Sequence, residues 1–221
     1  MSQYTKYPRT PHLPWSRGAT PDDIRMDDDN PFWLHGGDVV VSEKLDGESC
    51  SMYCDHIHAR SMDSLNHPSR EWVKRLHGEI SWQIPRDMKI CGENVYGKHS
   101  IGYDELTSFF YVFGICEWNE KIGEYMFLSW DDTEEWTKML GLKLVPVLYK
   151  GIPQWKDLHK KCWTRKSAFG GEQEGYVVRI ADSFMESEFE NCVAKFVRKN
   201  HVQTDQFWMK TWTPNKLLAK D

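Results

Sequence analysis

A lysine followed by an Asp-Gly pair is the feature of this sequence best suited to covalent chemistry. Lys44 stands in the segment Ser-Glu-Lys-Leu-Asp-Gly (42–47), after a run of valines that predicts a buried strand. Lysine is a poor nucleophile at its free pKa of about 10.4, but burial or nearby cations can favour the reactive neutral amine. Asp46 could orient this site or help to hold a hydrated metal ion. The alternative is an exposed hairpin turn carrying a surface lysine.

Other segments supply the remaining groups that phosphoryl transfer needs. Glu93 lies at the end of one predicted strand and Glu174 at the start of another. Phe113 belongs to the aromatic run 109–115 and could stack on a base, although a ring in an apolar strand is normally core. Lys195 lies in the last predicted strand. Together with Lys44, these residues could attack the α-phosphate of a nucleotide, which requires mainly positioning and neutralisation of charge by Mg²⁺ and cationic side chains.

These segments form a series of six blocks that resembles a known enzyme family. The blocks are Glu-Lys-Leu-Asp-Gly (43–47), Ala-Arg-Ser (59–61), Gly-Glu-Asn-Val-Tyr-Gly-Lys-His-Ser-Ile (92–101), Phe-Tyr-Val-Phe-Gly-Ile (110–115), Glu-Gly-Tyr-Val-Val-Arg (174–179) and Ala-Lys-Phe-Val-Arg (194–198). Over residues 39–202 the chain resembles the covalent nucleotidyltransferases. Within them it is most similar to the ATP-dependent RNA ligases, in the branch of the nick-sealing phage and kinetoplastid editing enzymes. The Gly-Lys-His-Ser-Ile stretch favours RNA ligases over DNA ligases and capping enzymes.

The resemblance implies a role for each matching residue. Lys44 would take AMP from ATP as a lysyl phosphoramidate and release pyrophosphate, with Asp46 and Lys195 assisting. The AMP would pass to an RNA 5′-phosphate, and attack by a 3′-OH would release it. The other implied contacts are Glu43 with the adenine edge, Phe113 with the adenine face, Glu93 with the ribose, Glu174 and Asp46 with Mg²⁺ or Mn²⁺ (Asp46 through water), and Arg60, Lys195 and Arg198 with phosphates.

Two departures from the family pattern leave alternatives open. Many relatives have Lys-x-Lys in the last block, whereas the second lysine position is Val197 here, so Arg198 or Lys199 would have to replace it. Few residues follow that block, which predicts that an OB or helical accessory domain, if needed, comes from a partner protein. The alternative functions are a DNA ligase, a GTP-using capping enzyme and, in a different class, a non-catalytic module that binds RNA ends.

Composition and charge are those of a globular protein, and they leave open a local basic groove on an acidic body. The 221 residues carry 28 Lys and Arg against 33 Asp and Glu, a net charge of −5, which argues against coating nucleic acid by bulk charge. From residue 193 onward six Lys and Arg face two Asp, so this end is the expected place for a polyanion. The sequence has no bilayer-spanning apolar run and no secretory signal. With six scattered cysteines, a cytoplasmic protein with reduced thiols and no membrane partner is expected.

Two further patterns favour structure over chemistry. Cys50, Cys54, His56 and His58 fit no standard zinc spacing, so strand packing is favoured over a zinc site. The glycine-containing stretch 170–175 lacks the Lys-Ser/Thr ending of a phosphate loop.

The elements that must position these residues predict an α+β fold, with twisted antiparallel sheets and flanking helices, of the nucleotidyltransferase type. Residues 1–37 are expected to form an irregular arm, 38–202 the nucleotidyltransferase domain, and 203–221 a short basic tail with Trp208 and Trp212 packed on it. Helices are expected at 69–81, after a capping box at 129–132 with a stop at Gly141, and at 204–211. Strands are expected at 39–41, 48–54, 57–61, 89–92, 109–117, 142–148, 175–180 and 192–197.

Overall fold

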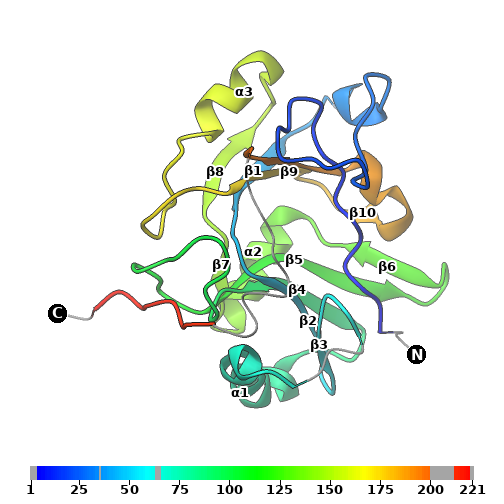
Figure 1. Ribbon diagram of the computed structural model, residues 1–221. Helices are drawn as coiled ribbons and strands as arrows, with labels where there is room; N and C mark the ends of the chain where they lie inside the picture. Colours follow the sequence, from blue (N-terminus) through cyan, green and yellow to red (C-terminus); the bar gives the residue numbers. More distant parts are fainter. Residues whose placement is uncertain (1–3, 35, 63–65, 200–211, 220–221) are drawn as a thin grey trace.

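Two β-sheets form the frame of the computed structural model, which describes residues 4–34, 36–62, 66–199 and 212–219 (Figure 1). The first sheet has four antiparallel strands in the order β11 (Val193–Val197), β9 (Gly175–Ile180), β1 (Val39–Lys44) and β8 (Val147–Gly151). The second has the order β10 (Phe184–Met185), β6 (Glu124–Phe127), β5 (Phe110–Asn119), β4 (Met88–Asn94), β2 (Glu48–Met52) and β3 (Ile57–Ala59). A two-residue strand, β7 (Lys143–Leu144), pairs in parallel with β5.

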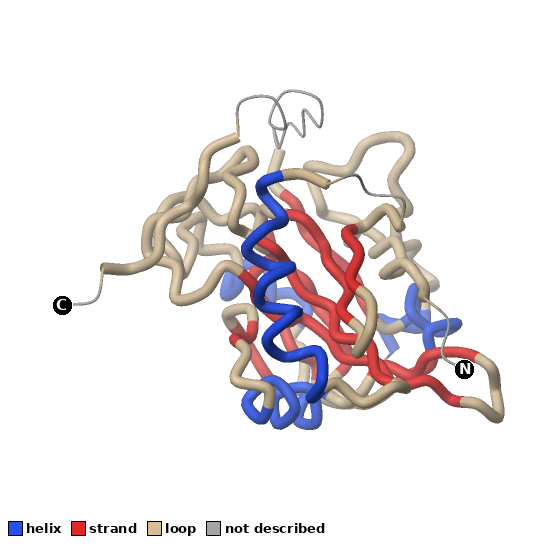
Figure 2. Tube along the Cα trace, turned by 90° about the horizontal axis from the view of Figure 1, so that it is seen from below, coloured by secondary structure: helices blue, strands red, loops and turns tan. Residues whose placement is uncertain are grey.

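Helices cover the outer faces of these sheets. Helix α3 (Trp155–Cys162) lies on the first sheet, whereas α1 (Glu71–Ile80) crosses the second, as the view from below shows (Figure 2). Helix α2 (Trp130–Met139) also packs on the second sheet. The described 3₁₀ helices are η1 (Pro31–Leu34), η2 (Pro68–Arg70), η3 (Ser81–Gln83) and η4 (Glu186–Asn191). None of the helices that the structure describes is long and apolar enough to cross a membrane.

Local sequence explains where several elements begin and end. Helix α2 starts at Ser129, whose hydroxyl oxygen accepts a hydrogen bond from the backbone N–H of Asp132 at 3.1 Å. It stops before Gly141, where the positive φ of 69° favours glycine. In α1, Val73 and Ile80 are seven residues apart and both are buried against the second sheet. The α+β class and the antiparallel sheets are therefore confirmed.

One predicted strand is wrong in a way that matters for the site. The expected strand 142–148 is two short strands, β7 and β8, which belong to different sheets. Pro146 separates them and has no N–H to continue a ladder. The backbone N–H of Val145 bonds to Val112 in the second sheet, whereas the carbonyl of Pro146 accepts from the N–H of Glu43 in the first. The strands β6 and β10 and the helix α3 were not predicted, and the expected helix 204–211 lies outside the described residues.

The Asp-Gly pair after Lys44 is a crossing between the sheets. Strand β1 belongs to the first sheet and β2 to the second, and Leu45 and Asp46 are buried between them. The alternative of an exposed hairpin turn is therefore wrong. A Cβ atom on Gly47 would lie 2.6 Å from the carbonyl oxygen of Asn94 on β4, so only glycine lets the chain cross this closely.

The N-terminal arm, residues 4–34, borders the first sheet along β11. The backbone N–H of Lys195 donates to Pro11, and the carbonyl of Lys195 accepts from the N–H of Leu13. Further along, Gly18 N–H donates to the carbonyl of Val197. The arm thus occupies the outer edge of β11 with a series of backbone hydrogen bonds.

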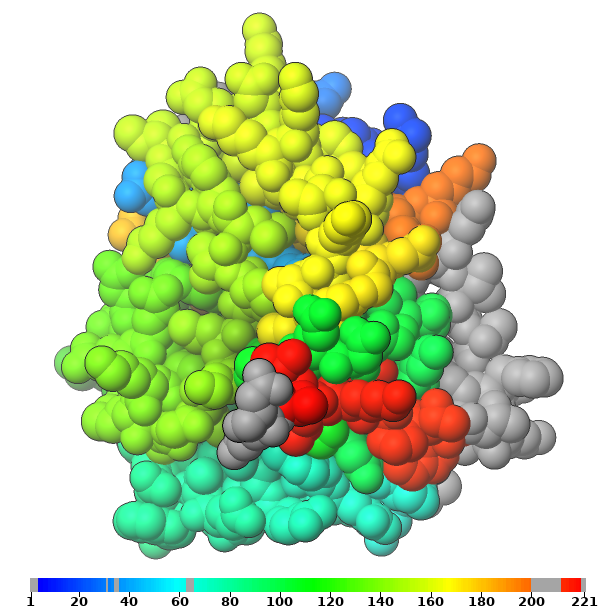
Figure 3. Space-filling view, turned by 90° about the vertical axis from the view of Figure 1, so that its left-hand side faces the viewer, coloured from blue at the N-terminus to red at the C-terminus, as the bar shows by residue number. Residues whose placement is uncertain are grey.

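Residues 212–219 lie across one face of the molecule (Figure 3). The N–H of Lys98 donates to the carbonyl of Thr213, and the N–H of Leu106 donates to that of Lys216. The side chain of Asn215 is buried and donates to the carbonyl of Val95. This segment is therefore fixed to the loop that follows β4.

Candidate active site

Lys44 ends β1 at the point where the chain leaves the first sheet. Its Nζ donates to Glu174 Oε2 at 2.8 Å, and the side chains of Lys44 and Glu174 are 23% and 1% exposed. The pair forms because Lys44 is opposite Gly175 in the β1–β9 register, one residue after Glu174. The ammonium is therefore accessible from outside while its partner carboxylate is fixed in the interior.

Carboxylates crowd around this lysine. Burial lowers the pKa of Lys44, but the nearby Glu174, Glu93 and Asp46 outweigh it and hold the pKa above its ordinary value. Burial raises the pKa of Glu93 to about 8, and Glu174 and Asp46 add to that rise while Lys44 opposes it. In this state Lys44 is protonated and non-nucleophilic, and Glu93 is largely neutral at pH 7. Added positive charge near the carboxylates would favour release of the lysine proton.

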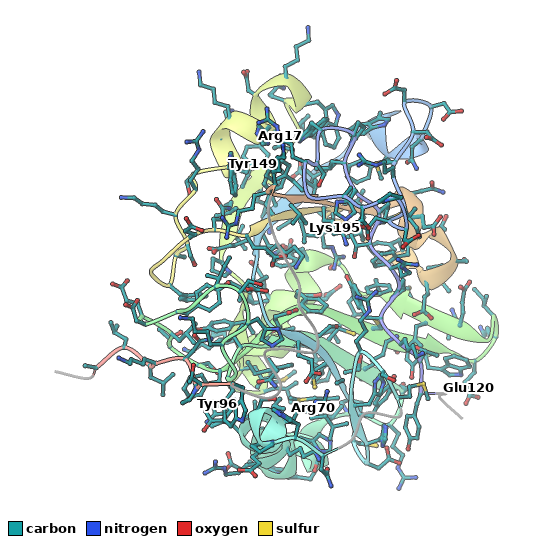
Figure 4. The ribbon with its side chains drawn as sticks, in the orientation of Figure 1. Arg17, Arg70, Tyr96, Glu120, Tyr149 and Lys195 are labelled. Atoms are coloured by element: carbon teal, nitrogen blue, oxygen red, sulfur yellow. The ribbon has the colours of Figure 1, made fainter. Side chains whose placement is uncertain are left out.

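Lys195 is a second cation beside Lys44. It lies on β11, opposite Val177, and burial together with the charge of Lys44 lowers its pKa to about 8. Lys44 is ion-paired, but within the described residues Lys195 has no ion-pair partner. The neighbouring His12 carries no charge at pH 7, because burial and the charge of Lys195 lower the pKa of the histidine to about 4. Lys195, which is labelled in Figure 4, is therefore a half-buried cation suited to an anionic ligand.

Asp46 connects the nucleophile strand to the loop after β4. Its Oδ2 accepts a hydrogen bond from the N–H of Ile101 at 2.6 Å, and its own N–H donates to the hydroxyl of Tyr103 at 2.8 Å. Both Asp46 and Tyr103 are 2% exposed. The Gly-Lys-His-Ser-Ile stretch is thereby held against the residues that follow Lys44. Tyr103 was not singled out in the sequence, where only its place just after that stretch marks it.

Glu43 faces away from Lys44, because adjacent residues of a strand point to opposite faces. Its Oε2 accepts from the N–H of Ala168 at 2.9 Å, and burial raises its pKa. Its Oε1 is buried and has no hydrogen-bond partner in the described part of the chain. An unsatisfied buried carboxylate oxygen is costly unless a donor, such as an amino group of a ligand, supplies the missing bond.

Phe113 is half-buried on β5, where the neighbouring Val112 is fully buried. Its ring meets the edge of Tyr7, from the arm, with a centroid distance of 4.9 Å. Burial raises the pKa of Tyr7 and the charge of Glu93 adds to the rise, so Tyr7 is close enough to Glu93 to sense its charge. Tyr7 is a residue that sequence reasoning missed, because nothing near it in the chain marks the arm as part of a site.

The two predicted arginines have different positions. Arg60 is exposed just after β3, and its charge contributes to the low pKa of Lys195, so it belongs to the same electrostatic group. Arg198 pairs with Glu172 at 2.7 Å and lines a separate cavity, whose walls include none of the residues around Lys44. The structure thus brings together Lys44, Asp46, Arg60, Glu93, Glu174 and Lys195, and places Arg198 beside them.

The carboxylates near Lys44 fit a divalent cation that is bound together with the phosphates of a nucleotide. No three His, Cys, Asp or Glu side chains converge in the described ranges in a way that could hold a metal by themselves, so the alternative of zinc at Cys50, Cys54, His56 and His58 is not supported. Mg²⁺ usually needs only one or two carboxylates and completes its shell with phosphates and water. Glu174, with Asp46 nearby, offers such carboxylates; burial is the main cause of the raised pKa of the adjacent Glu93, and the charges of Glu174 and Asp46 add to it.

Comparison with known proteins gives one family and one fold. Residues 37–197 match the family model described as RNA ligase. No curated protein matches the sequence. Among solved structures, a mutant of the Naegleria gruberi RNA ligase with ATP and Mn matches with a TM-score of 0.51 and 19% identity, over 74% of this chain and 50% of that one.

Two further structures have the same fold. Another mutant of the Naegleria gruberi ligase, with AMP and Mn, has a TM-score of 0.53 and 17% identity, over 86% of this chain and 60% of that one. An archaeal ATP-dependent RNA ligase has a TM-score of 0.52 and 15% identity, over 88% of this chain and 48% of that one. This chain therefore spans only about half to three-fifths of the length of these proteins.

Proposed function

The chain belongs to the RNA ligase family, and we propose that it is an ATP-dependent RNA ligase whose Lys44 carries AMP between ATP and RNA. The observation that carries this proposal is the position of Lys44. It is an accessible lysine paired with the buried Glu174, beside a second cation, Lys195, that has no ion-pair partner within the described residues. This arrangement is suited to a phosphate between two lysines and next to a carboxylate.

In the first step, neutral Lys44 Nζ attacks the α-phosphorus of ATP. A P–N bond forms, the bond to the bridging oxygen breaks, and pyrophosphate leaves with the bonding electrons. Lys195 and Arg60 stabilise the charge on the phosphates, and the proton of Lys44 passes to solvent as the carboxylates around it gain a positive partner. A bound Mg²⁺ or Mn²⁺, held by Glu174 and through water by Asp46, would neutralise phosphate charge. The neighbouring ligase structures contain ATP or AMP with Mn.

Three further residues are proposed to contact the base and the sugar. Glu43 would do so from the face of β1 opposite to Lys44, and the other two from the second sheet. Glu43 has a buried, unsatisfied Oε1 that can accept from the amino group of adenine. Phe113 offers a half-buried ring. Glu93 is largely protonated at pH 7, so its carboxyl group can donate as well as accept a hydrogen bond to a ribose hydroxyl.

In the next two steps the AMP moves to RNA and then leaves. A 5′-phosphate oxygen attacks the lysyl phosphoramidate, which breaks the P–N bond and forms a 5′–5′ anhydride. A 3′-OH then attacks the RNA phosphorus, a phosphodiester forms, and AMP departs.

A labelling experiment tests the first step directly. The purified chain is incubated with Mg²⁺ and α-labelled ATP, and label is sought on a denaturing gel. We expect label on the wild type and on Lys138→Ala, an exposed lysine of α2, but none on Lys44→Ala. The wild type is also incubated with Mn²⁺ in place of Mg²⁺. Label on Lys44→Ala, or no label on the wild type with Mg²⁺ or Mn²⁺, would overturn the lysyl-AMP proposal.

Three further arms separate the rival functions. Better labelling from GTP than from ATP would instead indicate a capping-type enzyme. Transfer of AMP to a phosphorylated DNA end as readily as to an RNA end would indicate a DNA ligase. RNA binding that is unchanged in Lys44→Ala, without any covalent nucleotide, would indicate a non-catalytic module for RNA ends.

A further inference from the structure

A cationic cavity lies on the side of β11 away from the Lys44 site. Its volume is about 330 Å³, and its walls include four cationic residues and two rings, namely Arg17, Arg165, Arg198, Lys199, Trp163 and Phe196. Lys195 and Phe196 are adjacent on β11 and so point to opposite faces of the sheet. The cavity is therefore a second site and not an extension of the carboxylate cluster around Lys44.

The positive charge of this cavity is poorly compensated. Within the described ranges Arg198 is the only one of the four cationic residues with an ion-pair partner, and that partner, Glu172, is 66% exposed. An exposed pair of this kind is weak and easily exchanged. The Nε of Arg198 is buried and has no hydrogen-bond partner in the part of the chain that the structure describes. The cavity thus presents unused donors and excess positive charge to an anion.

An aromatic surface accompanies the cations. Trp163 is half-buried and packs edge-to-face on the buried ring of Phe196, with centroids 5.1 Å apart. On its other edge, Phe196 meets His159 of α3 at 4.6 Å. Burial and the charge of Arg17 lower the pKa of His159, so this ring is neutral at pH 7. The wall therefore offers a flat, uncharged surface beside the cations.

The backbone holds the cations in place from three separate parts of the chain. Arg17 comes from the arm, where the hydrogen bond from Gly18 N–H to Val197 fixes it beside the end of β11. Figure 4 shows Arg17 close to α3 at the top of the first sheet. Arg165 has a φ of +65°, the only positive φ of a non-glycine residue in the described ranges. Such a conformation is strained for a residue with a side chain and occurs often at ligand-binding positions.

The cavity is adjacent to the chemistry. The N–H of Arg198 donates to the carbonyl of Glu174, the residue whose carboxylate binds Lys44. In Figure 3 the end of β11, in orange, lies beside the loop that carries Arg165, in yellow. Lys44 and Val197 are both opposite Gly175 in the register of the first sheet, so the cavity lies at the same end of this sheet as Lys44.

We propose that this cavity binds a nucleotide of the RNA strand next to the reacting end, and this proposal rests on the proposed function. The arginines hold its phosphate and Trp163 stacks on its base. Arginine contacts to phosphates combined with aromatic stacking are the usual way in which proteins bind single-stranded RNA. Arg17, Arg165 and Lys199 are exposed, so these cations can contact more than one phosphate of a chain. This feature favours a polynucleotide over a free mononucleotide.

Two variants test the cavity without threatening the fold. Arg165→Gly removes one cation and places glycine where φ is positive, so the protein should fold at least as well as the wild type. Trp163→Leu removes the stacking ring but keeps apolar contact with Phe196. Lys160→Ala is the matched control, because Lys160 is an exposed cation of α3 outside the cavity wall.

The readout is the affinity for a labelled, 5′-phosphorylated single-stranded RNA, measured by fluorescence anisotropy at two salt concentrations. We expect Arg165→Gly and Trp163→Leu each to raise Kd by about fivefold or more, and Arg165→Gly to reduce the salt dependence. Lys160→Ala should change Kd by less than about twofold. Self-adenylylation from ATP should be unchanged in all three.

Three outcomes would overturn the proposal. One is an unchanged RNA affinity in both cavity variants, and another is an equal loss in Lys160→Ala. The third is displacement of RNA by inorganic phosphate or AMP at equal concentration, which would make the cavity a site for small anions. If the wild type shows no covalent AMP but its RNA affinity still depends on Arg165 and Trp163, the ligase proposal fails and the cavity proposal stands.

Discussion

Replacing Glu93 by glutamine should make the protein more stable and less active. Burial and neighbouring carboxylates raise the pKa of Glu93 from 4.5 to about 8, so the folded state disfavours the charged form. At pH 7 the carboxyl is ionised in the unfolded chain but mostly protonated in the folded one. The interval between the unfolded pKa of 4.5 and pH 7 is about 2.5 pH units, and at about 1.4 kcal/mol each it costs the folded state about 3–3.5 kcal/mol. Glutamine carries no charge and avoids this cost.

The direction of the Glu93 pKa shift determines the pH range in which Glu93→Gln is more stable than the wild type. Because the pKa of Glu93 is higher in the folded state than in the unfolded one, its contribution to the free energy of unfolding falls as pH rises from 4.5 to about 8. The advantage of Glu93→Gln is therefore small at pH 5, reaches about 3–3.5 kcal/mol at pH 7, and stops growing above pH 8. For a chain of this size, each kcal/mol corresponds to about 2–4 °C in Tm.

The assay is urea unfolding of both proteins at pH 5, 7 and 9, with label from ATP measured in parallel. Glu190→Gln is the control, since Glu190 is exposed and should give no change. Equal stability of wild type and Glu93→Gln at pH 7 would refute the electrostatic reasoning, as would an advantage that is already complete at pH 5. Full labelling of Glu93→Gln would show that the crowded carboxylate has no role in the reaction.

Two other substitutions test neighbouring features. Lys195→Met should be more stable than the wild type at pH 7, because burial and Lys44 lower the pKa of this lysine to about 8. Its advantage should shrink between pH 8 and 10.5, as the wild-type lysine loses its proton, and chemical unfolding at pH 7 and pH 10 would reveal a constant difference if this is incorrect. Gly175→Ala should lower stability by about 3 kcal/mol, since its Cβ would lie 1.9 Å from the carbonyl oxygen of Phe196, and thermal unfolding measures this. Gly114→Ala, whose Cβ would be 3.7 Å from the nearest atom, is the control and should retain its Tm.

The fold could be predicted from sequence where a local pattern determines it. The Ser129 cap, the spacing of apolar residues in α1 and the aromatic strand around Phe110 all led to elements that the structure contains. The match of the RNA ligase model to residues 37–197 confirms the family resemblance. The assignment of β1 and β2 to different sheets could not be predicted, because in sequence residues 39–52 resemble a hairpin. Only the structure shows that the chain crosses at Gly47, close to the carbonyl of Asn94.

The functional residues likewise include some that could be identified from the sequence and some that could not. Lys44, Glu93, Glu174 and Lys195 could be identified because each stands at the end of, or within, a recognisable strand. The second cavity could not, since it unites the arm, α3 with the loop after it, and β11, which are far apart in sequence. Its strongest signal was the density of cationic residues in 159–166, whose meaning depends on the position of the arm.

The bonds between the arm and β11 also affect how one molecule behaves toward another. A free strand edge is a template for pairing with other chains and so a source of aggregation. Pro11, Leu13 and Gly18 occupy the donors and acceptors of β11 that would otherwise be open. Release of the arm would therefore expose an adhesive edge on the strand that carries Lys195. The strand proposed to contribute a phosphate-binding lysine is thus also the strand whose edge the arm protects from pairing with other chains.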